Sequence, residues 1–384
     1  MSIMRADLHQ MVDMVPEDYL QDVKEFLQNL PLQKPTDSDQ SKPLKDDFSP
    51  DNLTTHEVTC ENCAIAVPET PSLPALMGND AESKPCPPNC PYCHSASFLR
   101  RYGFKNGRQR YHCKKCQRTF NEATNTIRAG TSASLATWDI VIEDTINGVP
   151  IDATAQRINL SHSTVFNMRH RVLLGLSDPS FGNDIVLSNV AELDETYVLE
   201  SRKGKKFDES SDREPRLHGR RAEKRGLSDE QVCICTGVQR ACGPAYANTV
   251  NLASPSADEI KTVFDGHIAP GTVLLTDGMK SYKALQDNMD CFVGSIPVAA
   301  QKSKGIASLN NVNSFHSFIK ERYRHARSYA TKYLNRYNKV FAMAFRNREE
   351  TIKRLQEILR QPCIMAANMS NRRLKEATLN LAHA

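Results

Sequence analysis

The chain has 384 residues, which allows two or three domains of ordinary size (about 100–200 residues each). With 40% hydrophobic and 24% charged residues it does not have the composition of a fibrous or wholly disordered protein, and a net charge of +4 is too small to identify a polyanionic partner. It contains no run of about 18 apolar residues and does not begin with a signal peptide, so we expect a cytoplasmic protein without membrane contact. In that compartment its twelve cysteines are better interpreted as thiols or metal ligands than as disulfides.

The N-terminal part divides into two segments of different composition. Residues 1–30 have apolar side chains at helical spacing and predict a small helical appendage. Residues 31–84 are rich in Pro, Asp, Ser and Thr and predict a flexible linker. The isolated pair Cys60 and Cys63, and Cys86 beyond it, give only a weak metal signal and receive no assigned role.

Four cysteines within residues 85–124 have the spacing of a zinc ribbon. Cys90 and Cys93 form one C-x2-C knuckle, Cys113 and Cys116 form a second, and nineteen residues separate the two. Zn²⁺ prefers four soft ligands in a tetrahedron, and each knuckle supplies two thiolates from one tight turn. We therefore predict a structural Zn²⁺ at these four residues. The intervening arginines favour contact with DNA phosphates, and a purely structural module is the alternative.

Residues 132–178 have a pattern typical of a helix-turn-helix. Trp138, Ile142 and Ile146 recur at helical spacing, and Ser161 is placed to cap a later helix. A plain helical hairpin has the same pattern, but the position directly after the ribbon favours DNA binding. The later helix is expected to present polar and cationic residues outward, namely His162, Ser163, Asn167, Arg169, His170 and Arg171.

Residues 186–350 predict a sheet with two carboxylates at strand positions. The segment SNVAELDETYVL predicts a strand that carries Asp194, with two hairpin neighbours after it, and GTVLLTDG predicts a buried strand that ends at Asp277. A later helix places Asn313, His316 and Lys320 on one face. Oxygen ligands in this arrangement suit Mg²⁺, and two ions about 4 Å apart activate a nucleophile and stabilise a leaving oxygen in phosphoryl transfer.

The segments LDETYV, LLTDG, LNNVNSFHSFIK and ATKYLNRY, with the basic stretch at 201–230, resemble the zinc-ribbon transposases of bacterial insertion sequences. The resemblance covers residues 90–347. It implies an α/β protein, with an RNase H-like mixed-sheet core preceded by the zinc ribbon and the helical helix-turn-helix domain. It also implies a DDE-type catalytic site, here Asp194, Asp277 and Asn313 with Mg²⁺. Many relatives have glutamate at the third position; asparagine coordinates through its carbonyl but cannot act as a general base. Glu195 lies on the opposite side of a regular strand and is a weaker substitute.

Cations are concentrated in the insertion at residues 201–230, which favours a clamp on the DNA backbone over a solvated loop. Lys320 is a candidate phosphate contact or a surface lysine. Residues 333–345 predict a core helix with an aromatic face, and residues 351–384 a C-terminal helix and tail. The predicted DNA-binding residues are Lys203, Lys205, Lys206, Arg220, Arg221, Lys224, Arg225, Asn167, Arg169 and Lys320.

The resemblance implies an enzyme that binds the terminal inverted repeats of its element, cleaves DNA with Mg²⁺ and joins the freed 3′-hydroxyl to target DNA. Because two ends must be paired, a homodimer or higher oligomer is expected. A domesticated, catalytically inactive DNA-binding protein is the first alternative, kept open by Asn313. A nuclease or integrase acting on other DNA is the second.

Overall fold

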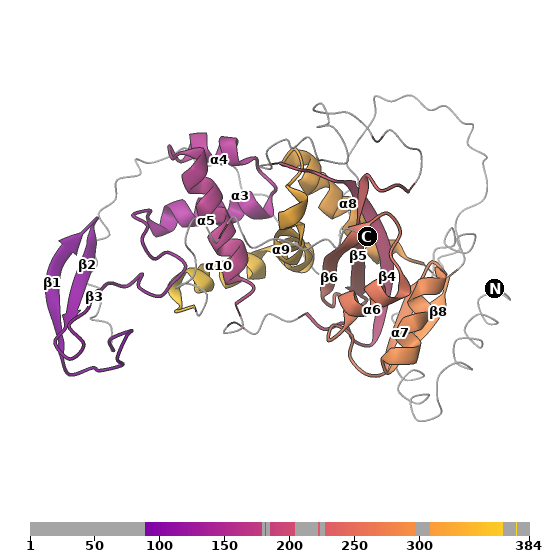
Figure 1. The fold of residues 1–384 in the computed structure, drawn as a ribbon, viewed down its shortest axis with the longest axis horizontal. Coiled ribbons are helices and arrows are strands. Elements are labelled where there is room, and N and C mark those ends of the chain that lie inside the picture. The colour runs from indigo at the N-terminus through magenta and orange to yellow at the C-terminus, as the bar shows by residue number, and fades with distance from the viewer. Residues whose placement is uncertain are drawn as a thin grey trace, which may run out of the picture. The chain divides into compact units, whose positions relative to one another are not determined.

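The computed structural model describes residues 89–178, 181, 185–203, 222, 227–296, 308–363 and 374. The predictions for residues 1–30 and 31–84 lie outside the described residues, as do those for most of the basic stretch at 201–230. Figure 1 gives the described elements in their chain order.

The N-terminal described part contains a small sheet followed by helices. Its elements are β1 (Leu99–Lys105), β2 (Arg108–Cys113), β3 (Thr119–Phe120), α3 (Leu135–Ile146), α4 (Ile151–Arg157) and α5 (His162–Gly175). The remaining part contains the large sheet and its helices. These are β4 (Val190–Leu199), β5 (Gln231–Gln239), β6 (Ala245–Leu252), α6 (Ala257–Phe264), β7 (Thr272–Thr276), α7 (Lys283–Asn288), β8 (Cys291–Ser295), α8 (Asn310–His325), α9 (Leu334–Arg346) and α10 (Arg348–Arg360), with 3-10 turns at Lys280–Tyr282 and Thr331–Tyr333.

The large sheet is mixed and has the strand order β6-β5-β4-β7-β8. β4, β5 and β6 form an antiparallel meander, whereas β7 pairs in parallel with β4, and β8 pairs in parallel with β7. Consecutive antiparallel strands need only short connections, but the parallel step from β6 to β7 requires a crossover, which α6 supplies. In the RNase H-like order, three strands form an antiparallel meander and further strands are added in parallel beside the first strand of that meander. The sheet has this order, so the predicted α/β core is confirmed.

Helices cover both faces of this sheet, as alternation along the strands requires (Figure 1). On one face Leu193 of β4 packs with Phe264 of α6 and Leu285 of α7. On the other face Ile234 of β5 and Phe315 of α8 belong to a larger cluster. The two neighbouring residues Leu193 and Asp194 therefore point to opposite layers, and Asp194 points to the layer that contains α8.

The larger cluster also contains the helices expected to form the helix-turn-helix. Trp138, Ile142 and Ile146 of α3 are fully buried in it, which confirms the predicted apolar face. Ser161 caps α5 by accepting a hydrogen bond from the backbone N–H of Thr164, as its position predicted. The same cluster includes α9 and α10, so α3 to α5 and the layer containing α8 share one hydrophobic core.

Among the helices that the structure describes, none is both long enough and apolar enough to cross a bilayer.

Candidate active site

The two predicted aspartates occupy matching positions on neighbouring parallel strands. Glu192 of β4 is level with Leu275 of β7. Continuing this register by two residues brings Asp194 level with Asp277, which follows the end of β7. Neighbouring strands lie about 4.8 Å apart, and residues two apart along a strand share a face. The sheet therefore sets the two carboxylates side by side on the α8 layer.

The electrostatics of Asp194 agree with this placement. Burial and the charge of Asp277 together raise the pKa of its carboxyl to about 6, against the opposing charge of Lys320. The backbone N–H of Glu195 also donates to Asp194 Oδ1 at 2.9 Å. Two partly buried carboxylates that repel each other form a site that favours a bound cation. Their oxygen donors fit Mg²⁺.

Helix α8 carries the third predicted group and two further polar residues. Asn313 is exposed near the start of the helix, His316 is buried one turn later, and Lys320 is exposed one turn beyond that. His316 Nδ1 lies 3.9 Å from Asp194 Oδ2, which fixes this face of α8 against the carboxylate pair. Asn313 lies one turn before His316 on the same face of α8, near the N-terminal end of the helix. Its side chain is exposed, so its side-chain carbonyl oxygen is available to solvent.

His316 is joined to the first aspartate through a threonine. Thr236 Oγ1 donates to the backbone oxygen of Asp194 at 2.7 Å and therefore accepts from His316 Nε2, also at 2.7 Å. This assigns the proton to Nε2 and leaves the Nδ1 lone pair facing the carboxylate. Burial, reinforced by Lys320, lowers the pKa of His316 to about 3, so the ring is neutral. Residue spacing predicted that His316 shares a face with Asn313, but its contact with Thr236 was not foreseen.

A buried glutamate holds the start of α8 on the sheet. The Glu192 carboxylate accepts hydrogen bonds from the backbone N–H of Asn311 at 2.8 Å and of Val312 at 3.0 Å, two of the unpaired amides at the helix N-terminus. Arg240 Nε donates to it at 2.8 Å, and the same guanidinium reaches the backbone oxygen of Ser308 at 2.6 Å. Glu192 thus fixes the helix that carries Asn313. Sequence reasoning missed it because these partners are more than forty residues away along the chain.

We expect Glu192→Ala to lower the free energy of unfolding by about 3–5 kcal/mol, because it leaves Arg240 and two helix amides without their buried partner. Urea denaturation measures this change. Glu321→Ala, which removes an exposed glutamate from the same helix, is the matched control and should cost less than about 1 kcal/mol. Equally small losses of unfolding free energy in the two variants would contradict the proposed role of Glu192 in holding the start of α8 on the sheet.

Glu195 faces the other layer, as strand alternation predicted. Its carboxyl interacts with the buried Tyr282 in the layer of α6 and α7. Burial, together with the charges of Asp194 and Asp277, raises its pKa to about 7. Glu195 is therefore close enough to feel the carboxylate pair, but its side chain points away from α8.

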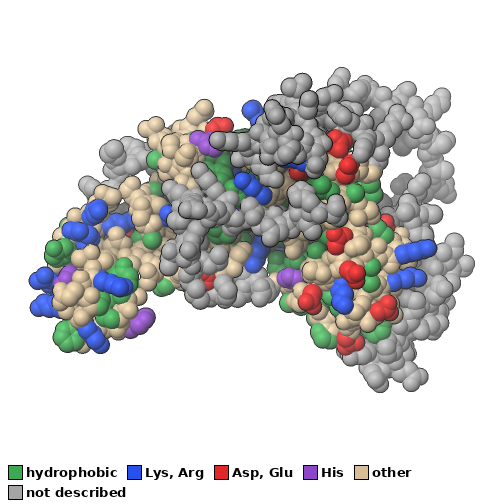
Figure 2. Space-filling model, viewed as in Figure 1, with side chains coloured by type: hydrophobic (Ala, Val, Ile, Leu, Met, Phe, Trp, Pro, Cys, Tyr) green, Lys and Arg blue, Asp and Glu red, His purple; other side chains and the backbone are tan. Residues whose placement is uncertain are grey.

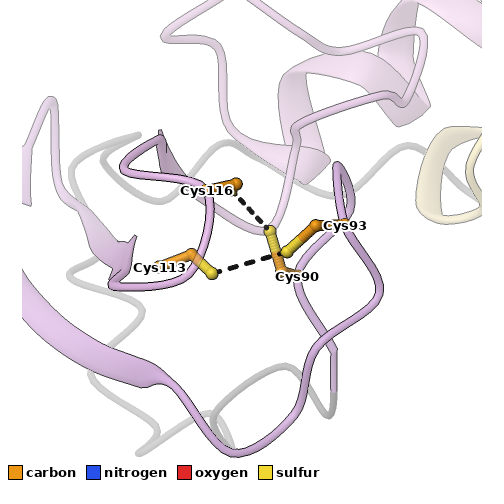
Figure 3. Close-up of side chains that lie close together, drawn as sticks. All are labelled: Cys90, Cys93, Cys113 and Cys116. Carbon is orange, nitrogen blue, oxygen red and sulfur yellow. Dashed lines mark hydrogen bonds between the residues drawn. The ribbon is translucent and has the colours of Figure 1, made fainter.

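The four predicted metal-binding cysteines converge in one cluster (Figure 3). Their sulfur atoms all lie within 4.8 Å of one another, and the pairs Cys90–Cys116 and Cys93–Cys113 are each 3.6 Å apart. Four thiolates at about 2.3 Å from one Zn²⁺ would be about 3.8 Å apart at the corners of a tetrahedron. The backbone N–H groups of Cys116 and Lys115 lower the pKa of Cys113 to about 7, which favours a thiolate at Cys113, whereas burial raises the pKa of Cys116 to about 11. The donor set and its spacing fit zinc.

The module around this cluster has a cationic surface that also exposes aromatic rings. Residues 89–121 contain no acidic residue. Figure 2 shows its Lys and Arg side chains gathered over the surface of this module. Tyr102 is 44% exposed and Phe104 is 71% exposed, and the guanidinium of Arg110 lies 5.2 Å from the centre of the Tyr102 ring. Exposed aromatic faces beside arginines suit contact with bases and phosphates.

The residues of α5 that were predicted to face outward are exposed in its first turns and buried or partly buried beyond them. His162 and Ser163 are exposed and Asn167 is partly exposed. Arg169, expected to face outward and bind DNA, is fully buried and donates to the backbone oxygen of Val149 at 2.9 Å.

His170 and Arg171 depart from the outward face as well. His170 is buried, and Arg171 donates to the backbone oxygens of Ile127 and Ala129. The reason is that α5 is covered on two sides, because α9 and α10 pack on the side that was expected to face solvent. The prediction that Arg169 contacts DNA is therefore wrong, because its side chain is buried.

The buried His170 gives a pH-dependent contribution to stability. Its Nδ1 lies 2.9 Å from Arg336 Nη1, which can only donate, so the ring accepts and must be neutral. Burial and the charge of Arg336 lower its pKa well below 6.5. In the unfolded chain the ring takes up a proton near pH 6.5, so the stabilisation is present above that pH and is lost as the pH falls below it.

We expect the free energy of unfolding of the wild type to fall more steeply below pH 6.5 than that of His170→Asn. The difference should approach about 1.4 kcal/mol per pH unit, because one extra proton binds to the unfolded wild-type chain. Asparagine does not titrate, and its Oδ1 can take the place of Nδ1 as an acceptor. Urea denaturation across this pH range measures both curves, and parallel curves would contradict the assignment.

Among the predicted DNA-binding residues of the basic stretch at 201–230, Lys203 is the one that the structure describes. It is exposed, and its Nζ donates to the backbone oxygens of Arg327 at 2.5 Å and Ser328 at 2.8 Å. The other predicted members lie outside the described residues: Lys205, Lys206, Arg220, Arg221, Lys224 and Arg225.

Comparison with known proteins supports the resemblance found in the sequence. Residues 186–347, which include both aspartates, Asn313 and Lys320, match the family described as the ISXO2-like transposase domain. A protein of Halobacterium salinarum, described as an uncharacterized protein in transposable element ISH50, is 27% identical over 201 residues. That match covers 52% of this chain and 65% of the relative, just under two thirds of its length.

Two solved structures resemble the chain more distantly. A pre-cleavage Mos1 transpososome shares 11% identity, with 54% of this chain and 73% of that chain covered and a TM-score of 0.24. The Mos1 strand transfer complex shares 13% identity, with 62% and 78% covered and a TM-score of 0.25. The fold assignment rests on the strand order of the sheet and not on these low scores.

Proposed function

We propose that this chain is a DNA transposase that cleaves DNA at the ends of an insertion sequence and joins them to target DNA. The observation that carries the proposal is the register of β4 and β7, which, extended by two residues, sets Asp194 beside Asp277. The charge of Asp277 acts on Asp194, and α8 carries Asn313 and Lys320 nearby. The match of residues 186–347 to a transposase domain supports it.

Asp194, Asp277 and the side-chain carbonyl of Asn313 would hold Mg²⁺, which supplies charge stabilisation to the oxygens of a reacting phosphodiester. The register of β4 and β7 holds the two aspartates in position, and Glu192 fixes the start of the helix that carries Asn313. His316 donates to Thr236 and keeps a neutral ring beside Asp194, so it adds no charge to the carboxylate pair. Lys320 would contact a phosphate of the DNA strand that enters the site.

DNA binding is assigned to three surfaces. The four-cysteine module, held by a structural Zn²⁺, would contact phosphates through its exposed cations. The first turns of α5 would enter a major groove with His162, Ser163 and Asn167. The stretch at 201–230 would clamp the backbone. Because two element ends must be paired before joining, we expect a homodimer or higher oligomer on the DNA.

The module's cations lead to a prediction about salt dependence. We expect the double variant Arg101→Ala/Lys105→Ala to bind duplex DNA with a weaker salt dependence. The magnitude of the slope of log affinity against log salt concentration should fall by about 1.8, since each phosphate contact contributes about 0.9. Fluorescence anisotropy over a salt series measures the slope. Lys353→Ala, at an exposed lysine of α10, should leave it unchanged. An unchanged slope in the double variant would remove the module from the DNA-binding surface.

The proposed function is tested with purified protein and DNA that carries the ends of its own element, in Mg²⁺ or without divalent ion. We expect nicks that expose a 3′-hydroxyl at the element ends, with Mg²⁺ only. The neutral Asn313 favours a second candidate function, a domesticated DNA-binding protein without catalysis. Tight binding to the ends with no cleavage in Mg²⁺ or Mn²⁺ would support that candidate and contradict the transposase.

A further inference from the structure

A pocket separates the start of α5 from the segment that joins α8 to α9. Its volume is about 830 Å³. Ser163, Phe166 and Asn167 of α5 line one side, and Ser328, Lys332 and Tyr333 line the other. Pockets of about 300–1,000 Å³ enclose small ligands, whereas a DNA duplex is far too wide to enter. The pocket also lies directly beside the turns of α5 that are proposed to read DNA.

The lining of the pocket is cationic. It includes Lys203, Arg327 and Lys332, and Asp152 is the only acidic side chain among the described lining residues. Asp152 lies 3.7 Å from the imidazole of His162. The excess of positive charge favours an anionic ligand.

The lining of the pocket also includes an aromatic ring on α5. Phe166 is half-buried, with its ring 4.2 Å from His170 and 5.9 Å from Tyr333, so neighbouring aromatic rings hold it in place. Asn167 and Tyr329 line the pocket beside it.

A nucleotide matches both the charge and the ring of this lining. Its base has a flat face that can stack on Phe166, and its phosphate would meet the cations. An apolar ligand would leave the cations without a counter-charge, and a simple anion would leave Phe166 unused.

We propose that this pocket receives one unpaired nucleotide of a DNA strand, with the base against Phe166 and the phosphate near Lys203 and Lys332. The inference rests on the proposed function, because it assigns the occupant to DNA that α5 and the active site already hold. The protein would then distinguish a DNA end with an unpaired nucleotide from a fully paired one.

The test compares two DNA duplexes of one sequence, one blunt and one with a few unpaired nucleotides at a 3′ end, the first of them 2-aminopurine. Binding of the full chain is measured by anisotropy without Mg²⁺, and 2-aminopurine fluorescence reports stacking. We expect the extended duplex to bind at least about fivefold more tightly, the smallest effect of stacking one base on an aromatic ring. Phe166→Ala and Lys332→Ala should each reduce that preference while affinity for the blunt duplex stays unchanged. Lys353→Ala should leave both affinities unchanged.

Equal binding of the two duplexes by the wild type, or a preference that survives both pocket variants, overturns the pocket assignment and leaves the transposase proposal intact. Binding of free deoxyadenosine monophosphate without a preference for the extended duplex overturns it too, because the occupant would not be a DNA strand. Absence of binding to either duplex contradicts the proposed function itself. Lys332→Ala changes a partly exposed side chain, so it keeps the test valid if Phe166→Ala fails to fold.

Discussion

Replacing Asp194 or Asp277 with asparagine is expected to lower the rate of Mg²⁺-dependent cleavage at element ends by about 10³-fold or more. Each replacement removes one negative oxygen donor from a two-carboxylate site. Metal ions contribute several kcal/mol to the stabilisation of the transition state in phosphoryl transfer, and each 1.4 kcal/mol corresponds to a factor of ten in rate. Single-turnover cleavage of a labelled DNA end measures the rate.

The matched control is Asp287→Asn, which neutralises an exposed carboxylate on α7, away from the α8 layer. It should leave the rate unchanged. The active-site variants should bind DNA as well as the wild type, because neither aspartate is assigned to DNA contact. Asp194→Asn should also have at least the unfolding free energy of the wild type. In the metal-free protein, burial and the charge of Asp277 disfavour the ionised Asp194 carboxylate, and asparagine carries no charge. Cleavage at the wild-type rate by either variant would remove the aspartates from the catalytic site.

Loss of the proposed Zn²⁺ is expected to unfold the four-cysteine module. Its only cluster of buried apolar side chains among the described residues contains Tyr111, Phe120 and two of the cysteines, which is too small a core to fold without a metal. Cys113→Ser should therefore lose bound zinc and expose the backbone of β1 and β2. Metal analysis and amide hydrogen exchange of residues 89–121 measure both effects.

Cys242→Ser is the matched control, because Cys242 is exposed and lies outside the cluster. It should retain zinc and the exchange protection of the wild type. A chelator applied to the wild type should reproduce the effect of Cys113→Ser on the module and leave the large sheet protected, since that sheet has its own core. A module that stays protected in Cys113→Ser would show that its fold does not depend on metal.

The sequence predicted the elements that carry the site because their signals are local. Alternation in β4 identified the strand of Asp194, and helical spacing placed Asn313, His316 and Lys320 on one face of α8. The knuckle spacing identified the four cysteines that the fold brings together. In each case the pattern lies within a short stretch of chain, where period and turn chemistry decide the local structure.

The sequence could not predict what packs across long separations. Arg169 and His170 look solvent-facing on a helical wheel, but α9, more than 150 residues later, covers them. Glu192 looks like one more polar residue in an alternating strand, and only the folded chain reveals that it caps α8. The pairing of Asp194 with Asp277 was inferred from resemblance, whereas the register of β4 and β7 gives it a geometric basis.

The most direct test of the proposed function is strand transfer. Purified chain is incubated with DNA carrying its element's ends and a supercoiled plasmid, with or without Mg²⁺, and joined products are mapped. A transposase yields element ends joined through their 3′-hydroxyls to the plasmid, only with Mg²⁺ and not with Asp277→Asn. Cleavage at the ends without any joined product would contradict the account and indicate a nuclease.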